Sequence, residues 1–300
     1  MSSRDELYVY EWNAGDGSLL FALCPDAVDV PATLGEDYLD VLARIPEVRG
    51  GWFVFHVNLT DTSSTPRRRN LLCRELHARG VEVINGNATD ISKRRVQSAC
   101  RALGLPAVAA VQDADPNELL IVKTDRNCNG IGEAMASAEE ACRLGLQDPA
   151  LGVERFEYRI LPRKDVGRDV WDCKSLVVER YISNSQDLLY TAYMFLDRMV
   201  ISLVTDPEPL KKMPAGIPRI NWFYTLPGMQ MRGGDAAPPP RKLLEDAVTF
   251  RSALGLDLCV LDIVPDDEGG FYIVDVNTTP FFRDTGQPEL LRFLASALTP

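Results

Sequence analysis

The stretch Leu254–Pro280 reads LGLDLCVLDIVPDDEGGFYIVDVNTTP, and it decides how we interpret the rest of the chain. Two strongly apolar runs, 259–264 and 271–276, flank an acidic turn that ends in two glycines. Apolar runs of this length, separated by turn residues, are typical of two strands joined as a hairpin. The polar residues within the two runs therefore stand out as candidates for a functional site.

Three of these polar residues form a possible metal site. Asp275 and Asn277 are two residues apart on one strand and point to the same face, which Asp262 can reach from the neighbouring strand. Two carboxylates and an amide oxygen suit Mg²⁺ or Mn²⁺, with the other positions left to water and phosphate. The alternative is a set of polar residues on a solvated sheet face. The apolar flanks favour the metal site, because an unpaired charge in a core is costly.

Basic and glycine-containing segments precede this hairpin. Lys123 ends the apolar strand 119–123, where a lysine either extends to solvent or points at an anion. The loop 125–133 contains two glycines and can aim backbone N–H groups at phosphates, or be an ordinary turn; it is not a P-loop. Lys93 begins a basic triplet at the start of a helix predicted over 92–103, and a solvated basic face explains it equally well.

A further strand, 175–181, carries an acid near its end. Glu179, followed by an aromatic and a β-branched residue, can present a carboxylate and backbone groups to a base and a ribose. The alternative is a strand that simply ends in solvent. The segment 207–240 is dense in proline and glycine and is predicted to be an extended loop or lid. Its aromatic triplet 222–224 either lines an acceptor pocket or packs the segment down.

Composition excludes several classes of function. The 300 residues include 32 Lys and Arg against 43 Asp and Glu, a net charge of −11. Such an acidic chain is not expected to bind nucleic acid or an anionic membrane, although a local basic pocket can still hold a small anion. The charged N-terminus and the absence of a long apolar run predict a cytoplasmic protein. Seven cysteines without a CxxC pair suggest neither disulfides nor zinc, and two histidines leave little for histidine-based chemistry.

The order of elements predicts an α/β fold. Strands and helices alternate over the first 88 residues, which indicates a small parallel sheet covered by helices. We expect three parts: 1–88, 89–185 and 186–300. The predicted strands are 7–12, 52–57, 81–84, 119–123, 156–160, 175–181, 188–195, 199–204, 259–264 and 271–276, and the predicted helices are 36–45, 70–79, 92–103, 137–144, 241–254 and 288–298.

In sequence order, these pieces resemble the ATP-grasp ligases, the superfamily of D-alanine–D-alanine ligase and glutathione synthetase. The resemblance covers roughly residues 80–285. It runs through ISKRRVQ…LGLPAV, LLIVKTDRNCNGIGE, LVVERYI, a strand pair ending near Ile201, and the hairpin quoted above. It implies an ATP-grasp fold in which 1–88 is a shortened N-terminal parallel α/β domain, 89–185 is the small lobe and 186–300 is the large lobe with the metal site.

The resemblance also implies roles for individual residues. Lys93 and Lys123 would contact the α- and β-phosphates of ATP, and the loop with Asn127, Gly130 and Gly132 would close over the triphosphate. Glu179 would accept the adenine amino group beside the backbone of Tyr181 and Ile182, and Asp187 or Gln186 would hold the ribose. Metal ions that bridge the β- and γ-phosphates would be held by Asp262, Asp275 and Asn277.

Two departures from the family pattern are visible. Asp275 stands where the family usually has Glu, and it is shorter but still able to coordinate a metal. Many members carry an Arg in the strand after the ribose acid, whereas this strand reads LLYTAY. The cations for the γ-phosphate and the acyl oxygen must then come from elsewhere, and the candidates are Lys211, Lys212, Arg219 and Arg283.

The implied activity is an ATP- and Mg-dependent carboxylate–amine ligase that works through an acyl phosphate and releases ADP and phosphate. Its partners would be a carboxylate and an amine, as small molecules or as a peptide, and a homodimer would fit the family. Two alternatives remain: a non-catalytic ATP-binding sensor, and a small-molecule or sugar kinase. Neither substrate is identified by the sequence.

Overall fold

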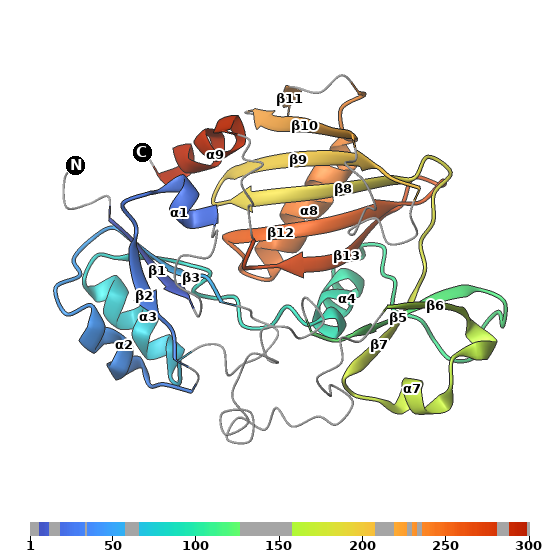
Figure 1. Cartoon of the computed structure of the whole chain (residues 1–300), viewed down its shortest axis with the longest axis horizontal. Helices are drawn as coiled ribbons and strands as arrows, with labels where there is room; N and C mark the ends of the chain where they lie inside the picture. Colours follow the sequence, from blue (N-terminus) through green and yellow to red (C-terminus); the bar gives the residue numbers. More distant parts are fainter. Residues whose placement is uncertain are drawn as a thin grey trace.

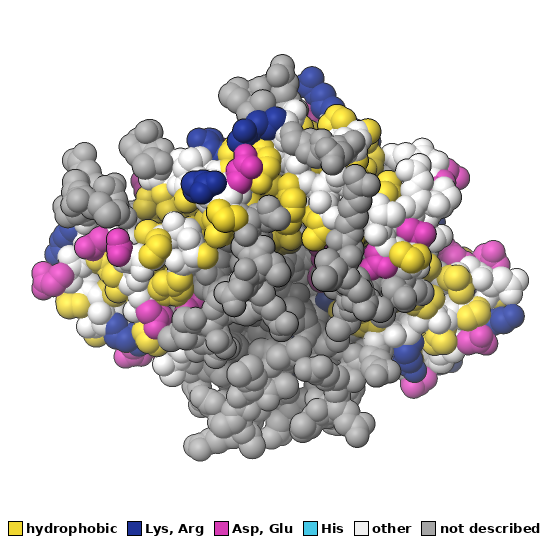
Figure 2. Space-filling view, turned by 45° about the horizontal axis from the view of Figure 1, so that its top comes forward, with side chains coloured by type: hydrophobic (Ala, Val, Ile, Leu, Met, Phe, Trp, Pro, Cys, Tyr) yellow, Lys and Arg dark blue, Asp and Glu magenta, His cyan; other side chains and the backbone are white. Residues whose placement is uncertain are grey.

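The computed structural model describes residues 6–11, 19–33, 35–57, 66–126, 158–207, 219–226, 230–232, 236–280 and 288–298. These residues form three sheets with helices packed around them (Figure 1), which confirms the predicted α/β class. In the space-filling view, acidic and basic side chains are interspersed around hydrophobic ones (Figure 2). None of the described helices is long and apolar enough to span a membrane.

The N-terminal sheet is parallel, as predicted, with strand order β2-β1-β3-β4. Its core forms because aromatic and β-branched side chains of the short strands bury both faces: Tyr10, Phe53 and Phe55 pack together on the side of the helices. The short elements α1 and β2 have too few residues for a periodic signal and were not predicted. The elements are β1 (Leu7–Glu11), α1 (Leu19–Leu23), β2 (Val28–Pro31), α2 (Tyr38–Arg44), β3 (Trp52–Phe55), α3 (Arg69–Ala78) and β4 (Glu82–Ile84).

A three-stranded antiparallel sheet, which we call the small sheet, follows with order β6-β5-β7. It is preceded by α4 (Lys93–Ala102), whose N-cap Ser92 accepts a hydrogen bond from the backbone N–H of Arg95 at 3.3 Å. The other elements are β5 (Leu119–Thr124), β6 (Arg159–Pro162), η4 (Arg163–Asp165), α7 (Arg168–Asp172) and β7 (Leu176–Arg180). The predicted helix 137–144 and the first residues of the predicted strand 156–160 lie outside the described residues.

The large sheet has six antiparallel strands in the order β11-β10-β9-β8-β12-β13. Its strands are β8 (Leu188–Phe195), β9 (Arg198–Thr205), β10 (Arg219–Leu226), β11 (Gln230–Arg232), β12 (Leu258–Pro265) and β13 (Phe271–Asn277). The prediction of an extended loop or lid over 207–240 is wrong for β10 and β11. The aromatic run in β10 has high strand propensity, but the prolines and glycines on either side masked that signal.

The two faces of the large sheet are different. One face packs on α8 (Arg241–Ala253), which lies behind the sheet in Figure 1, and it carries apolar side chains: Ala192, Ile201, Phe223, Leu261 and Val276. At one end of the opposite face, Phe195 and Leu258 pack against Leu7, Val9 and Val54 of the N-terminal sheet. Leu290 and Leu294 of α9 (Pro288–Ala295), which is followed by η6 (Ser296–Leu298), join this contact. We call this opposite face the site face.

The side chain of Asn85 joins the N-terminal sheet to the large sheet. Its Oδ1 accepts hydrogen bonds from the backbone N–H groups of Asp257 and Leu258 at 2.8 and 2.9 Å, and its Nδ2 donates to the Leu258 carbonyl at 3.0 Å. In return, the Asp257 carboxylate accepts from the Asn85 N–H at 2.7 Å. Asn85 is fully buried and has a φ of 59°, which asparagine adopts more readily than most residues. The start of β12 is therefore fixed relative to the end of β4.

Candidate functional site

The strand register brings the predicted metal ligands together on the site face. Asp262 of β12 lies directly opposite Asp275 of β13, and Asn277 lies two residues further along the same strand. Across β12 the row continues to Thr191 of β8, whose hydroxyl donates to Asp262 Oδ1 at 3.1 Å. Both carboxylates are buried, with 8% of each residue exposed. Two carboxylates with an amide nearby thus lie on one patch.

A β-bulge at Val274 turns Asp275 to the site face. The register pairs Ile263 with Ile273 and Asp262 with Asp275, so Val274 is an extra residue without an opposite partner. Ile273 and Val276 both pack in the core on the α8 side. Strict alternation would have placed Asp275 on that same side as Ile273, because side chains two apart share a face. The bulge shifts the alternation by one residue and leaves the acid facing away from the core.

Two lysines from other elements reach β13 beside this patch. Lys93, the first residue of α4, lies 3.6 Å from Asp275 Oδ1 and donates to the Arg126 carbonyl at 2.7 Å. Lys123 of β5 donates to the carbonyl of the bulged Val274 at 3.4 Å. Both lysines are buried, so they are weakly screened by water. The structure therefore joins the small sheet, α4 and the acid pair at one point.

The N-terminus of α4 is held against the end of β5 by Asp125. Its carboxylate accepts from the Arg94 N–H at 2.9 Å and forms an ion pair with Arg94 Nε at 3.2 Å, and its carbonyl accepts from the Lys93 N–H at 3.2 Å. Burial raises the pKa of Asp125, while the hydrogen bond and charge of Arg94 act in the opposite direction. These contacts fix the position from which Lys93 extends toward β13.

Glu179 is the most buried acid of this region. Its carboxylate lies 2.7 Å from Lys123 Nζ, and 1% of the residue is exposed. Among the described residues, Glu179 Oε1 has no donor, and Oε2 has only the Lys123 ammonium of this ion pair. Leaving a buried carboxylate oxygen without an N–H or O–H donor is unfavourable, so the site fits a ligand that brings its own N–H group.

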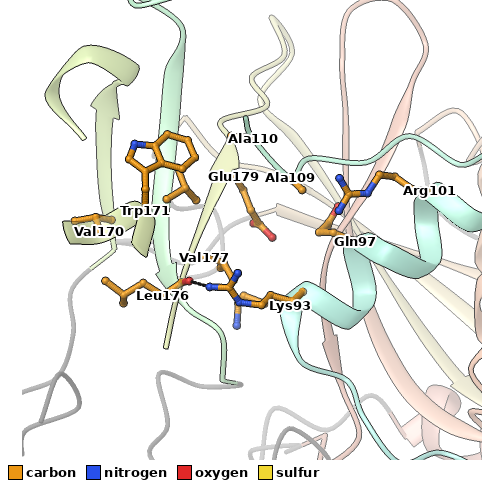
Figure 3. A pocket seen from close by; sticks show the side chains of 12 residues that line it. Lys93, Gln97, Arg101, Ala109, Ala110, Val170, Trp171, Leu176, Val177 and Glu179 are labelled. Carbon is orange, nitrogen blue, oxygen red and sulfur yellow. Dashed lines mark hydrogen bonds between the residues drawn. The ribbon is translucent and has the colours of Figure 1, made fainter. Parts of the chain in front are cut away.

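A pocket of about 260 Å³ lies between α4 and β7, and Glu179 extends into the space between these two elements (Figure 3). Lys93, Gln97 and Arg101 line it from α4, and Val177 and Trp171 line it from the small sheet and α7. Gln97 also ties α4 to both neighbours: its Nε2 donates to the Ile273 carbonyl at 3.0 Å and its Oε1 accepts from the Val108 N–H at 2.8 Å. Cations thus outnumber acids on the wall of this pocket.

The residues predicted to bind the base and ribose follow β7. The Tyr181 N–H donates to the Leu119 carbonyl at 3.0 Å, Ile182 comes next, and both side chains are half-buried. Asp187 stands directly before β8 with a φ of 53°, a left-handed conformation that aspartate and asparagine adopt more readily than most other residues. Its carbonyl accepts from the Asp206 N–H at 3.0 Å, so the backbone at this corner is fixed.

The acid pair fits a hard divalent cation bound together with phosphates. No group of three or more His, Cys, Asp or Glu side chains suited to a metal occurs in the part of the chain that the structure describes. Mg²⁺ is commonly held by one or two carboxylates plus substrate phosphates, which is what Asp262 and Asp275 offer. Asn277 Oδ1 accepts hydrogen bonds from the backbone N–H of Thr279 at 2.8 Å and from the Thr279 hydroxyl at 3.1 Å. To bind a metal, this oxygen must give up one of these two hydrogen bonds.

Several predicted residues fall outside what the structure describes. These are Asn127, Gly130 and Gly132 of the glycine loop, and Lys211, Lys212 and Arg283 among the candidate cations; Arg219 begins β10, but its side chain is not described. Of the predicted site residues, the structure describes the side chains of Lys93, Lys123, Glu179, Tyr181, Ile182, Asp187, Asp262, Asp275 and Asn277.

Sequence reasoning missed residues next to this site. Thr191 carries a hydroxyl group within an otherwise apolar strand, and this exception could have marked it as a candidate site residue. His56 lies 2.9 Å from Glu11 at the adjoining carboxyl ends of β3 and β1, and both residues are buried. This end of the N-terminal sheet reaches the metal motif, because the Thr278 hydroxyl donates to the Val57 carbonyl at 2.9 Å.

Comparison with known proteins rests on structure. No protein-family model and no curated protein matches the chain. Among solved structures, the ATP-grasp ligase PsnB complexed with its minimal precursor superimposes with a TM-score of 0.57 at 12% identity, covering 98% of each chain. The chain has the ATP-grasp fold. An L-amino acid ligase from Bacillus licheniformis gives a TM-score of 0.53 at 12% identity, covering 99% of this chain and 74% of that one.

A further structural neighbour is the macrocyclase MdnC, bound with the precursor peptide MdnA from Microcystis aeruginosa MRC. It has a TM-score of 0.51 at 9% identity and covers 98% of this chain and 99% of its own. Another structure of PsnB, with a TM-score of 0.54 at 12% identity, contains Mg and ADP. At these identities the likeness establishes the ATP-grasp fold, and the fold expected from the sequence is thereby confirmed.

Proposed function

We propose that this protein is an ATP- and Mg-dependent carboxylate–amine ligase. The observation that carries the proposal is the meeting of Lys93 and Lys123 with the acid pair at β13, where Lys93 lies 3.6 Å from Asp275 and Lys123 donates to Val274. Two cations beside two acids in a buried place suit a polyphosphate bound together with a divalent cation. The Mg and ADP in one PsnB structure support the same pairing of ligands.

Each part of the site receives a role in this proposal. Lys93 and Lys123 neutralise the α- and β-phosphates, and Glu179 Oε1, which has no donor among the described residues, accepts the adenine amino group beside Tyr181 and Ile182. Asp187 holds the ribose, and the loop with Asn127, Gly130 and Gly132 covers the triphosphate. Asp262, Asp275 and Asn277 would hold the metal, which would neutralise charge on the β- and γ-phosphates. Lys211, Arg219 and Arg283 are proposed to face the γ-phosphate and acyl oxygen.

The chemistry requires positioning and charge neutralisation more than a protein nucleophile. A substrate carboxylate oxygen bonds to the γ-phosphorus of ATP, the bond from that phosphorus to the β–γ bridging oxygen breaks, and ADP leaves. An amine nitrogen then bonds to the acyl carbon and releases a proton to solvent while the carbon–oxygen bond to phosphate breaks, giving an amide and free phosphate. Buried lysines favour these steps because they act in a site of low dielectric. The three parts 1–88, 89–185 and 186–300 would act as N-terminal domain, small lobe and large lobe.

The test is an assay for ADP and phosphate released from Mg-ATP with the twenty amino acids, singly and in pairs. Asn277→Ala serves as the inactive variant and Asn87→Ala, an exposed residue outside the site, as the matched control. We expect phosphate release that needs a substrate pair and is lost in Asn277→Ala. ADP without free phosphate would instead indicate a kinase. Nucleotide binding without turnover across amino acids and peptide substrates would indicate a sensor.

A further inference from the structure

On the site face, a polar row runs outward from the acid pair to two aromatic rings. From Asp262 the register leads to Thr191 of β8, then to Ser202 of β9, and then to Trp222 of β10. Neighbouring strands are about 4.8 Å apart, so Trp222 lies about 14 Å from Asp262, measured across the sheet. Tyr193, two residues beyond Thr191 on the same face, lies diagonally from Asp262 at about 7–8 Å. Polar groups near the acids thus give way to aromatic ones with distance.

The two rings meet over β9. Their centroids are 5.6 Å apart with an angle of 43° between the planes, and the Tyr193 hydroxyl hydrogen-bonds to Ser202. Both rings are half-buried and pack at the border of the apolar contact between the large sheet and the N-terminal sheet. The pair is therefore held in place from one side.

Among the described residues, the register positions next to the pair on this face are uncharged, and the first charge lies one strand further out. Tyr193 stands between Val260 and Val200, and that row continues to Tyr224 and then to Arg232, which lies over the Tyr224 ring and is ion-paired with Glu289. Ser202 and Thr191 occupy the adjacent row. A charged group placed here would lose hydration without gaining an opposite charge from these positions, whereas an apolar group would gain contact with two rings. The surface around Tyr193 and Trp222 thus favours apolar ligands.

We infer that Tyr193 and Trp222 bind an apolar group of the carboxylate substrate, remote from its reacting end. The inference rests on the proposed function, in which the carboxylate must lie at the γ-phosphate beside Asp262 and Asp275. The row begins at these acids, so the substrate that reacts there passes Thr191 and Ser202, with Tyr193 beside them, before it reaches Trp222. The substrate is therefore elongated, with a polar carboxylate at one end and an apolar or aromatic group at the other.

The test measures binding of phenyl-substituted acids of increasing length to the full chain with Mg²⁺ and AMPPNP, so that no turnover occurs. The probes are phenylacetate, 4-phenylbutyrate and 8-phenyloctanoate, titrated by calorimetry. We expect affinity to increase with length, and Trp222→Ala to weaken 8-phenyloctanoate about tenfold while phenylacetate is unchanged. Trp222→Phe should restore most of the affinity. Asn221→Ala, the next residue of β10 on the α8 side, should behave as wild type.

Equal affinities for the three acids, no binding of any of them, or an equal loss in Asn221→Ala would overturn the inference. The proposed function is monitored separately in the same samples. AMPPNP affinity reports the nucleotide site, and hydroxamate formation from acetate, ATP and hydroxylamine reports carboxylate activation. In that reaction the hydroxylamine nitrogen displaces phosphate from the acyl carbon, and its proton passes to the buffer. Loss of these two signals counts against the ligase, whereas their presence without length dependence counts against the aromatic subsite alone.

Discussion

The Lys123 ammonium lies 2.7 Å from Glu179 Oε2, and the two residues come from neighbouring antiparallel strands, offset by two positions. In the register, Ile121 faces Glu179 and Lys123 faces Val177, so the pair forms a diagonal contact on one face of the small sheet. Both side chains are almost completely buried. The pair balances two charges that would each be unfavourable alone, in a place that the proposed function assigns to the nucleotide.

Replacing Lys123 with Met should destabilise the fold by about 3–5 kcal/mol, because a buried carboxylate would lose its counter-charge. The double variant Lys123→Met with Glu179→Leu should lose much less than the sum of the two single changes. Urea unfolding of the wild type, the two single variants and the double variant measures this double-mutant cycle. Additive effects would contradict a coupled ion pair, and AMPPNP titration should show weakened binding in both variants that lack Lys123.

Replacing Thr191 with Val should weaken the metal site without removing a proposed ligand. The Thr191 hydroxyl donates to Asp262 Oδ1 at 3.1 Å and orients the carboxylate. Loss of such an outer partner typically lowers metal affinity about 10–100-fold. Mn²⁺ binding in the presence of ADP, followed by electron paramagnetic resonance, measures the change. Thr205→Val, an exposed threonine at the end of β9, is the control, and equal affinity in both variants would contradict the role of Thr191.

The hairpin that carries the acids could be predicted because its signals are local. Two apolar runs, a glycine turn and three oxygen-bearing side chains lie within 27 residues, and the expected antiparallel pair is what forms. The two lysines were expected near a nucleotide only through the resemblance. Their meeting at β13 depends on contacts between segments about 150 residues apart, such as Lys123 with Val274, which periodicity does not report.

Other parts of the structure could not be predicted from the sequence, because they depend on strand pairing. The strand β10 is flanked by prolines and glycines, and its partner β9 selects the strand conformation through pairing that propensity alone does not describe. The bulge at Val274 has no marker residue, since it is a valine between other strand formers. Thr191 could be recognised as a neighbour of the acid pair only from the register, which places it opposite Asp262.

Replacing Asn85 with Ala should destabilise the protein by about 3 kcal/mol or more. Three backbone groups of Asp257 and Leu258 would lose their buried partner, and each unsatisfied group costs about 1–3 kcal/mol. Urea unfolding measures the loss. Asn85→Gly separates two causes, because it removes the side chain but accepts the φ of 59° without strain. Similar losses in both variants would assign the effect to the hydrogen bonds, and a stability near wild type in either would contradict it.

The thiols of Cys100 and Cys259 should resist alkylation until the protein unfolds. Burial raises the pKa of each to about 12, from an ordinary value of 9.0. The native state keeps both protons while the unfolded state loses them, so the free energy of unfolding should fall as pH rises above about 9. Iodoacetamide labelling with and without denaturant, mapped by mass spectrometry, tests the protection. Rapid labelling of either cysteine in the native protein would contradict it.

The bulge at Val274 determines which face of the sheet the later side chains of β13 point to. Flattening the bulge into a regular strand of the same length would leave every ligand type in place, yet it would turn Asp275 and Asn277 toward α8 and Val276 toward the acid patch. Losing Val274 itself would not do so, because Asp275 would then follow Ile273 directly and neighbours on a regular strand point to opposite faces. The same residues are therefore compatible with two arrangements of this strand, one with a site and one with charges in its core, and the bulge selects the first.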